Sequence, residues 1–232
     1  MEISEILVDS FKYPIKNLRV MGFYLVLFIV AAIGLVIIGI GIDSAAANIA
    51  ISLLLCIIGF IILIIPLLLL QGYLLDVIKI GIIRGNNPPG LDIKRQILNA
   101  LKLLALMLAY MGVPVLLTYS LGILHPYLSV IGILMVIGSF FPFIMAQCKL
   151  AQTDSLTAAL AIGEAIGDLI RIGTFKVVAV VIIFTVLSYA ISIIGNLIQQ
   201  SSQTIGILFT LIFTAYLGLA QSKGYGLLYS YI

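Results

Sequence analysis

The sequence predicts an all-α, polytopic membrane protein with six transmembrane helices. Hydrophobic residues make up 63% of the chain and charged residues only 9%, whereas a soluble domain carries about 25% charged residues. Two long stretches, Leu103–Cys148 and Val177–Ser222, contain no Asp, Glu, Lys or Arg, and a third, Val20–Leu75, contains only Asp43. Because one spanning helix needs about 20 apolar residues, each stretch has room for two spans and the turn between them.

The expected spans are joined alternately by short outer turns and longer inner segments. The spans are Leu18–Ile42, Asn48–Leu70, Leu103–Leu124, Tyr127–Gln147, Lys176–Leu197 and Thr204–Ala220. The outer turns, which contain none of the 12 Lys and Arg residues, are Asp43–Ala47, Ile123–Pro126 and Ile198–Gln203. By the positive-inside rule, this asymmetry predicts a multi-pass protein of the cell membrane with both termini in the cytoplasm. We expect a single integral membrane domain over residues 1–232.

The inner segments have the charge spacing of amphipathic helices that lie in the headgroup layer. The first has charges on one face at Glu2, Glu5, Asp9, Lys12, Lys16 and Arg19. The second has Asp92, Arg95, Asn99 and Lys102, and the third has Glu164, Asp168 and Arg171. We expect Pro14 to break or kink the first helix near Tyr13, and either Asp154 or Ser155 to cap the third.

The bases of these segments are candidate contacts for lipid headgroups, because anionic headgroups attract Lys and Arg beside a span. They are Lys12, Lys16, Arg19, Lys94, Arg95, Lys102, Arg171 and Lys176. A simpler interpretation is that these charges are solvated helix faces and topology signals. We favour it over a specific lipid-binding site.

The order of amphipathic helix, span and span occurs three times, which suggests three copies of one helix-hairpin unit. The units are approximately 1–84, 85–153 and 154–232. Each ends its hairpin with a glutamine, and the repeat signature is Gln71, Gln147 and Gln221. An amide at a span end can hydrogen-bond headgroups, water or a neighbouring backbone, which we favour over a substrate site. Gly85–Gly90, rich in turn-forming residues, is interpreted as a plain connector.

Three short motifs carry a family resemblance. They are Phe11-Lys-Tyr-Pro14, Gln71-Gly-Tyr-Leu74 and the Asn-Pro-Pro of Gly85–Gly90. Together they resemble an uncharacterised family of six-span archaeal and bacterial membrane proteins, catalogued as a domain of unknown function. The repeat pattern is more loosely similar to the membrane domain that some bacteria fuse to a glycerophosphodiester phosphodiesterase. There is no room for that catalytic domain in the chain, so the resemblance implies a fold and no activity.

No constellation of residues indicates catalysis. The single histidine, His125, is expected in a tight outer turn, and the acids lie along helix faces instead of pairing in one pocket. Cys56 and Cys148 are expected at different depths as buried thiols, without metal-site spacing. We therefore expect no enzymatic activity, metal or cofactor. Binding to nucleic acid is not expected either, because it would need a clustered basic face.

One face of the fifth span is polar and is the best candidate for a functional seam. Its residues are Thr185, Ser188, Ser192 and Asn196. Helix packing through hydroxyl groups is the favoured use of this polar seam, and a lined pathway is the alternative.

These features favour a non-enzymatic scaffold, accessory subunit or lipid-organising component. Its expected partners are the lipid bilayer and either another membrane protein or a second copy of the chain. The alternative is a permease or carrier for an apolar or lipid-like small molecule. A carrier should have a continuous polar cavity between its spans, whereas a scaffold should be packed shut with an exposed apolar or small-residue face.

Ser188→Glu tests how the polar seam is used. If the seam is packed, the new carboxylate would be buried without a partner, and the variant should fail to fold. The measurement is the yield of detergent-extracted protein that elutes as a single species in size-exclusion chromatography, with Ser188→Ala as the control. A fully folded, abundant Ser188→Glu protein would count against packing and support a water-lined path.

Overall fold

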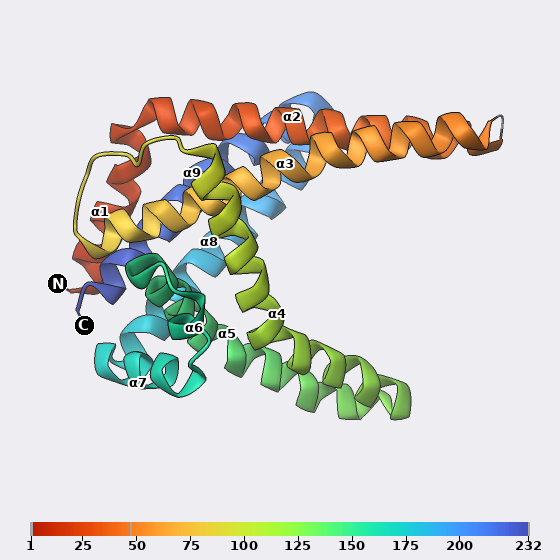
Figure 1. Ribbon diagram of the computed structural model, residues 1–232. Helices are drawn as coiled ribbons and strands as arrows, with labels where there is room; N and C mark the ends of the chain where they lie inside the picture. Colours follow the sequence, from red (N-terminus) through yellow and green to blue (C-terminus); the bar gives the residue numbers. More distant parts are fainter. Residues whose placement is uncertain (1, 47, 232) are drawn as a thin grey trace.

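The computed structural model describes residues 2–46 and 48–231, which form helices joined by short connections (Figure 1). The helices are α1 (Ile3–Lys16), α2 (Leu18–Asp43), α3 (Ile49–Ile82), α4 (Ile93–Leu124), α5 (Ser129–Thr153), α6 (Leu156–Ala159), α7 (Ile162–Ile172), α8 (Thr174–Ser201) and α9 (Gln203–Tyr229), with 3-10 turns η1 (Ser44–Ala46) and η2 (Pro126–Leu128). Six helices of the described part are long and apolar enough to cross a membrane. The predicted all-α class and six spans are confirmed; Ala47 of the first outer turn lies outside the described residues.

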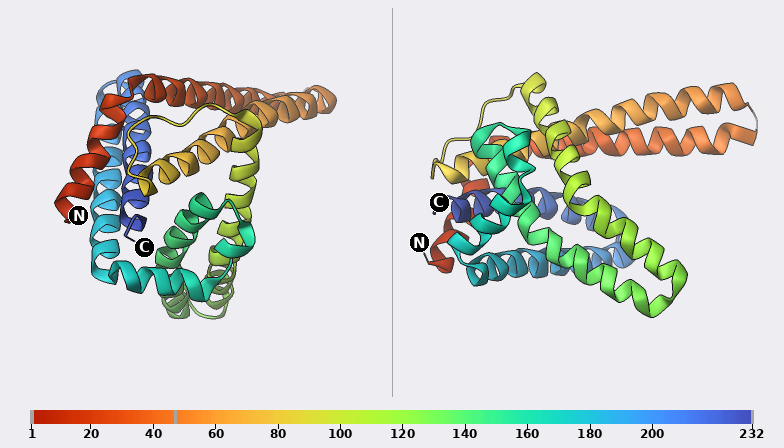
Figure 2. Two further views of the ribbon diagram at one scale, coloured as in Figure 1. Left: turned by 60° about the vertical axis from the view of Figure 1, so that its left-hand side comes forward. Right: turned by 60° about the horizontal axis from the view of Figure 1, so that its bottom comes forward.

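The long helices pair into three hairpins, α2–α3, α4–α5 and α8–α9. The first two hairpins diverge toward their tips, while the two termini lie close together at the opposite end (Figures 1 and 2). We call this end the base: it comprises α1, α6, α7, the start of α4 and the adjoining ends of α3, α5 and α9. The side of the membrane that the base faces stays a prediction.

Most of the buried core lies in the base. In α3, nine of the twelve buried residues fall between Leu69 and Gly81, and the buried part of α5 is concentrated between Phe143 and Ala151. Toward the tips, side chains such as Leu53 (59% exposed) face outward. Apolar spans gain little by leaving lipid for one another, so packing is concentrated where inner segments and helix ends meet.

The elements of the base contact one another in a closed order. α1 packs on α9, α4 packs on α3, and α7 packs on α5. The helices α1, α4 and α7, which belong to the three leading segments, therefore each pack against the last helix of a different unit. These contacts link the ends of the chain directly, because α1 and α9 are neighbours. The threefold sequence repeat itself stays a prediction.

Two helices begin or end differently from the sequence prediction. α1 continues past Pro14 and ends at Lys16, three residues beyond the expected break at Tyr13. The side-chain amide of Asn17 donates to the Tyr13 carbonyl at 2.9 Å and terminates the helix there. The second inner segment is no separate helix: Asp92 caps the backbone N–H of Arg95 at 3.0 Å, and α4 runs unbroken from that cap into its span.

The third inner segment is split into α6 and α7. Ser155 caps α6 by accepting a hydrogen bond from the backbone N–H of Ala158 at 3.4 Å, so Ser155 is the correct choice of the two expected caps. Asp154 instead ends α5 with a positive φ of 55°. The chain then turns so that α7 lies across the base (Figure 2).

α3 and α9 cross at a pair of glycines that allow their backbones to touch. A methyl group added to either Gly81 or Gly226 would lie 2.7 Å from the Cα atom of the other glycine. Small residues permit this close approach of two membrane helices. The crossing fixes the relative position of the helices that carry Gln71 and Gln221.

Gly226→Ala should destabilise the protein by about 1–3 kcal/mol, because overpacking forces backbone shifts. The measurement is thermal unfolding in mild detergent, followed by circular dichroism. Gly22→Ala in α2 is the matched control, since no atom lies within 4 Å of the added methyl group, and it should leave stability unchanged or raise it. Equal melting temperatures for Gly226→Ala and the unmodified protein would contradict the close crossing.

Candidate functional site

The base ends of α3, α5 and α9 surround a cavity of about 220 Å³. Gln71 of α3, Gln147 of α5 and Gln221 of α9 all line it, so the repeat signature converges on one place. The Gln221 amide donates a hydrogen bond to the Tyr225 hydroxyl. None of the described lining residues is charged, and most are apolar, as Leu75 is.

The chemistry of this central cavity is that of neutral hydrogen bonding. Each glutamine amide both donates and accepts, so the cavity can hold the polar end of a mainly apolar molecule. The described residues that line it include no carboxylate, imidazole or ammonium group. Sequence analysis matched the three glutamines but missed their shared cavity, because nothing local in the sequence brings three distant hairpins together.

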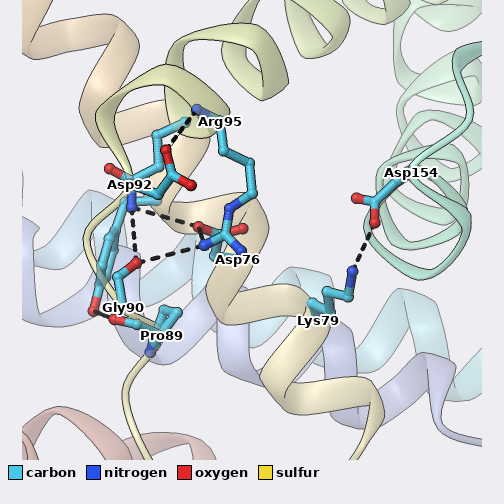
Figure 3. Close-up of polar contacts among 9 residues, drawn as sticks. Asp76, Lys79, Pro89, Gly90, Asp92, Arg95 and Asp154 are labelled. Atoms are coloured by element: carbon cyan, nitrogen blue, oxygen red, sulfur yellow. Dashed lines mark hydrogen bonds and ion pairs between the residues drawn. The ribbon is translucent and has the colours of Figure 1, made fainter.

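An ion pair between a buried carboxylate and a half-exposed arginine connects α3 to the start of α4. The Asp76 side chain is 6% exposed and accepts a hydrogen bond from Arg95, 2.9 Å from its Oδ2 (Figure 3). Gln96, which is fully buried, also lies within 3.5 Å of this oxygen. The expectation that the acids lie on solvated faces is wrong for Asp76, because α3 continues to Ile82 and α4 packs against it.

Carbonyl groups of the Gly85–Gly90 segment accept hydrogen bonds from side chains of α3 and α4. The Pro89 carbonyl accepts a hydrogen bond from the Tyr73 hydroxyl at 3.5 Å, and the Gly90 carbonyl accepts one from Arg95 at 3.5 Å (Figure 3). The segment is therefore more than the plain connector expected. Its Gly90 carbonyl contacts both Arg95 and Gln96, the two side chains that bind Asp76.

A second buried acid, Asp168, joins α7 to α5 and α9. It accepts a hydrogen bond from the Tyr229 hydroxyl at 2.7 Å and lies 3.8 Å from the Lys149 ammonium group. Lys149 also donates to Glu164, and this bond lowers the pKa of the Glu164 carboxyl. The charged face of α7 thus turns toward Lys149, while Ile170 on its other face is 66% exposed. The prediction that Asp168 lies on a solvated helix face is therefore wrong.

The bases predicted to contact headgroups fall into two groups. Five bases are exposed and bind no carboxylate or carbonyl among the described residues: Lys12, Lys16, Arg19, Lys94 and Arg171. The others bind within the protein: Arg95, itself half exposed, binds the buried Asp76 carboxylate, and Lys102 donates to the Asp154 carbonyl at 2.8 Å. The Lys176 ammonium lies 5.0 Å from the centre of the Tyr231 ring. Headgroup contact stays a prediction for the exposed group.

The polar seam of α8 is exposed along its length. The hydroxyls of Thr185 and Ser188 donate to carbonyls of their own helix, each at 2.9 Å. Ser188 borders a cavity of about 110 Å³ that Gln221 also lines. Ser192 and Asn196 are exposed as well, so packing of the seam would require a partner outside this chain.

Residues 55–199 match the family described as "Protein of unknown function (DUF4013)". The chain belongs to this family. No curated protein and no solved structure matches it. The looser similarity to the membrane domain of glycerophosphodiester phosphodiesterases is not supported.

The DUF4013 match runs from α3 into α8. It includes two of the three cavity glutamines, Gln71 and Gln147, and both partners of the Asp76–Arg95 ion pair. Gln221 and the whole of α1 and α9 lie outside it. The matched region of this chain therefore contains the ion pair and most of the cavity wall, and the family description assigns no activity.

Arg95→Met should destabilise this DUF4013 protein, because the buried Asp76 carboxylate would lose its charged donor. The expected loss is about 1–3 kcal/mol, the range for hydrogen bonds to charged groups. Chemical unfolding in detergent measures it. The neighbouring exposed Lys94→Met is the control and should change stability by less than about 0.5 kcal/mol.

Replacing both partners, as Asp76→Asn with Arg95→Met, should restore part of the stability, because no buried charge is left unpaired. If Arg95→Met and Lys94→Met unfold alike, the ion pair contributes nothing to holding α4 against α3.

Proposed function

We propose that the protein is a non-enzymatic, lipid-organising component of the cell membrane, with both termini in the cytoplasm. The observation that carries this proposal is an apolar groove of about 410 Å³ between α5 and α8. Its lining residues are Val136, Ile137, Phe140, Phe141, Val181, Ile182, Thr185 and Val186. Such a groove accommodates an acyl chain without leaving any polar group unsatisfied.

The side chains of the groove favour an acyl chain over a partner helix. Membrane helices associate closely through small residues such as Gly, Ala and Ser, whereas this groove is walled by branched and aromatic residues. Thr185 supplies the hydroxyl group in this wall. That hydroxyl already donates a hydrogen bond to the Val181 carbonyl at 2.9 Å. A flexible lipid tail adapts to such a wall better than a rigid helical backbone.

The buried acids support a structural role. Asp76 is bound by Arg95 at 2.9 Å, and Asp168 accepts a hydrogen bond from the Tyr229 hydroxyl at 2.7 Å. A general acid or base must reach the proton that it transfers in a substrate. Carboxylates held by internal partners in this way stabilise helix contacts instead.

The second candidate function is a carrier for an apolar or lipid-like molecule, and the central cavity favours it. Three amides, from Gln71, Gln147 and Gln221, converge there among apolar side chains. A molecule with one polar end and an apolar body would match this lining. The cavity lies at the junction of three hairpins, where a change in their spread would alter its access.

Val186→Trp tests the lipid-organising function. Val186 is 59% exposed in the groove, and the larger side chain should displace an acyl chain from it. The measurement is native mass spectrometry of the protein released from its own membranes in mild detergent. We expect phospholipid at fixed stoichiometry on the unmodified protein and at least one fewer lipid on the variant.

Val113→Trp in α4 is the matched control, because Val113 is 62% exposed outside the groove, and it should retain the full lipid complement. A co-purifying protein without specific lipid would contradict the lipid-organising function and favour an accessory scaffold. A non-lipid small molecule that is lost from Gln147→Leu would favour the carrier.

A further inference from the structure

A small polar pocket lies between α1, α9 and the segment that follows α3. Its volume is about 100 Å³, enough for a group of several heavy atoms, since one water needs roughly 10–15 Å³ of such space. Four bases line it, Lys12 and Lys16 of α1, Arg84 after α3, and Lys223 of α9. Asp9 is the one acid among its described lining residues, so bases outnumber acids in the wall.

Lys223 fixes a positive charge in the wall of this pocket. The residue is 1% exposed, and its ammonium donates to the carbonyls of Gly85 and of Ile80, the latter at 3.2 Å. It also lies 5.5 Å from the centre of the Tyr13 ring. These three partners are neutral and orient the ammonium, and the Asp9 carboxylate of the same pocket is the acid that acts on its charge.

The Tyr13 hydroxyl is a buried donor that lacks a partner. Tyr13 is 2% exposed, lines the pocket, and its hydroxyl makes no hydrogen bond within the described residues. Leaving such a group unsatisfied costs about 1–3 kcal/mol. Burial raises the pKa of Tyr13 to about 12, so the hydroxyl keeps its proton at neutral pH and can donate it to an acceptor.

We propose that this pocket binds a phosphate group, carried either by an anionic lipid headgroup or by a free phosphate ion. A phosphate offers several strong acceptor oxygens, which match the cluster of Lys and Arg donors and the unpartnered Tyr13 hydroxyl. Arg84 supplies the planar guanidinium that pairs well with oxyanions. Lys12 and Lys16, exposed on the pocket rim, would complete the neutralisation.

The position of the pocket favours a lipid as the source of the phosphate. α1 is the amphipathic helix that leads into the first span, and such helices lie at headgroup level. This choice of source rests on the proposed lipid-organising function, whereas phosphate binding itself rests only on the pocket. The pocket is formed by different residues from those of the α5–α8 groove and can be tested separately.

Tyr13→Phe is the sharpest test, because it removes the unpartnered hydroxyl and keeps the ring beside Lys223. The full chain in neutral detergent is titrated with phosphatidylglycerol, phosphatidylcholine and inorganic phosphate, and bound species are counted by native mass spectrometry. We expect a preference for phosphatidylglycerol and about tenfold weaker binding by Tyr13→Phe, the loss of one hydrogen bond to a charged group. Without ligand, the variant should melt no lower than the unmodified protein.

The double variant Lys12→Gln with Lys16→Gln should also bind weakly. Lys94→Gln with Lys176→Gln removes two bases outside this pocket and should leave binding at the pocket itself unchanged. Competition by inorganic phosphate would support the phosphate group as the determinant, and binding of phosphatidylglycerol alone would assign the site to a headgroup. Binding of inorganic phosphate alone would keep the site and contradict the lipid source. Absence of binding by both probes, or equal losses in both double variants, would overturn the proposal.

Discussion

Inside a bilayer, apolar helices gain no hydrophobic free energy by exchanging lipid for one another, and the architecture of this protein follows from that constraint. The first two hairpins diverge toward their tips (Figure 1), and most of the exposed side chains along their spans are apolar. Within the hairpins, close glycine contacts such as that of Gly34 with Gly59 bring the paired spans together. At the base, ion pairs to buried carboxylates and carbonyls bound by side-chain donors add interactions that lipid cannot replace.

The contacts in the base join each of the three expected units to both of the others. α1 packs on α9, α4 on α3 and α7 on α5, so none of these elements can move without disturbing a neighbour. The central cavity sits where the second helices of all three hairpins meet. The three hairpins therefore share the walls of this cavity.

The sequence was informative wherever one property extended over many residues. Charge-free stretches located all six spans, and the matched glutamines identified three positions that meet in space. Asp76 and Asp168 were misread because their partners, Arg95 and Tyr229, lie 19 and 61 residues away. Helical spacing places a charge on a face, but the identity of the surface opposite that face depends on how distant segments pack.

The Gly85–Gly90 segment shows how an irregular stretch can be constrained without distinctive side chains. Its contacts to Lys223, Tyr73 and Arg95 are made through backbone carbonyls, which every residue type supplies. Natural selection should therefore act on the length and backbone path of this segment as well as on its turn-forming residues. In related chains we expect few insertions or deletions there, and a positive residue retained where Lys223 stands.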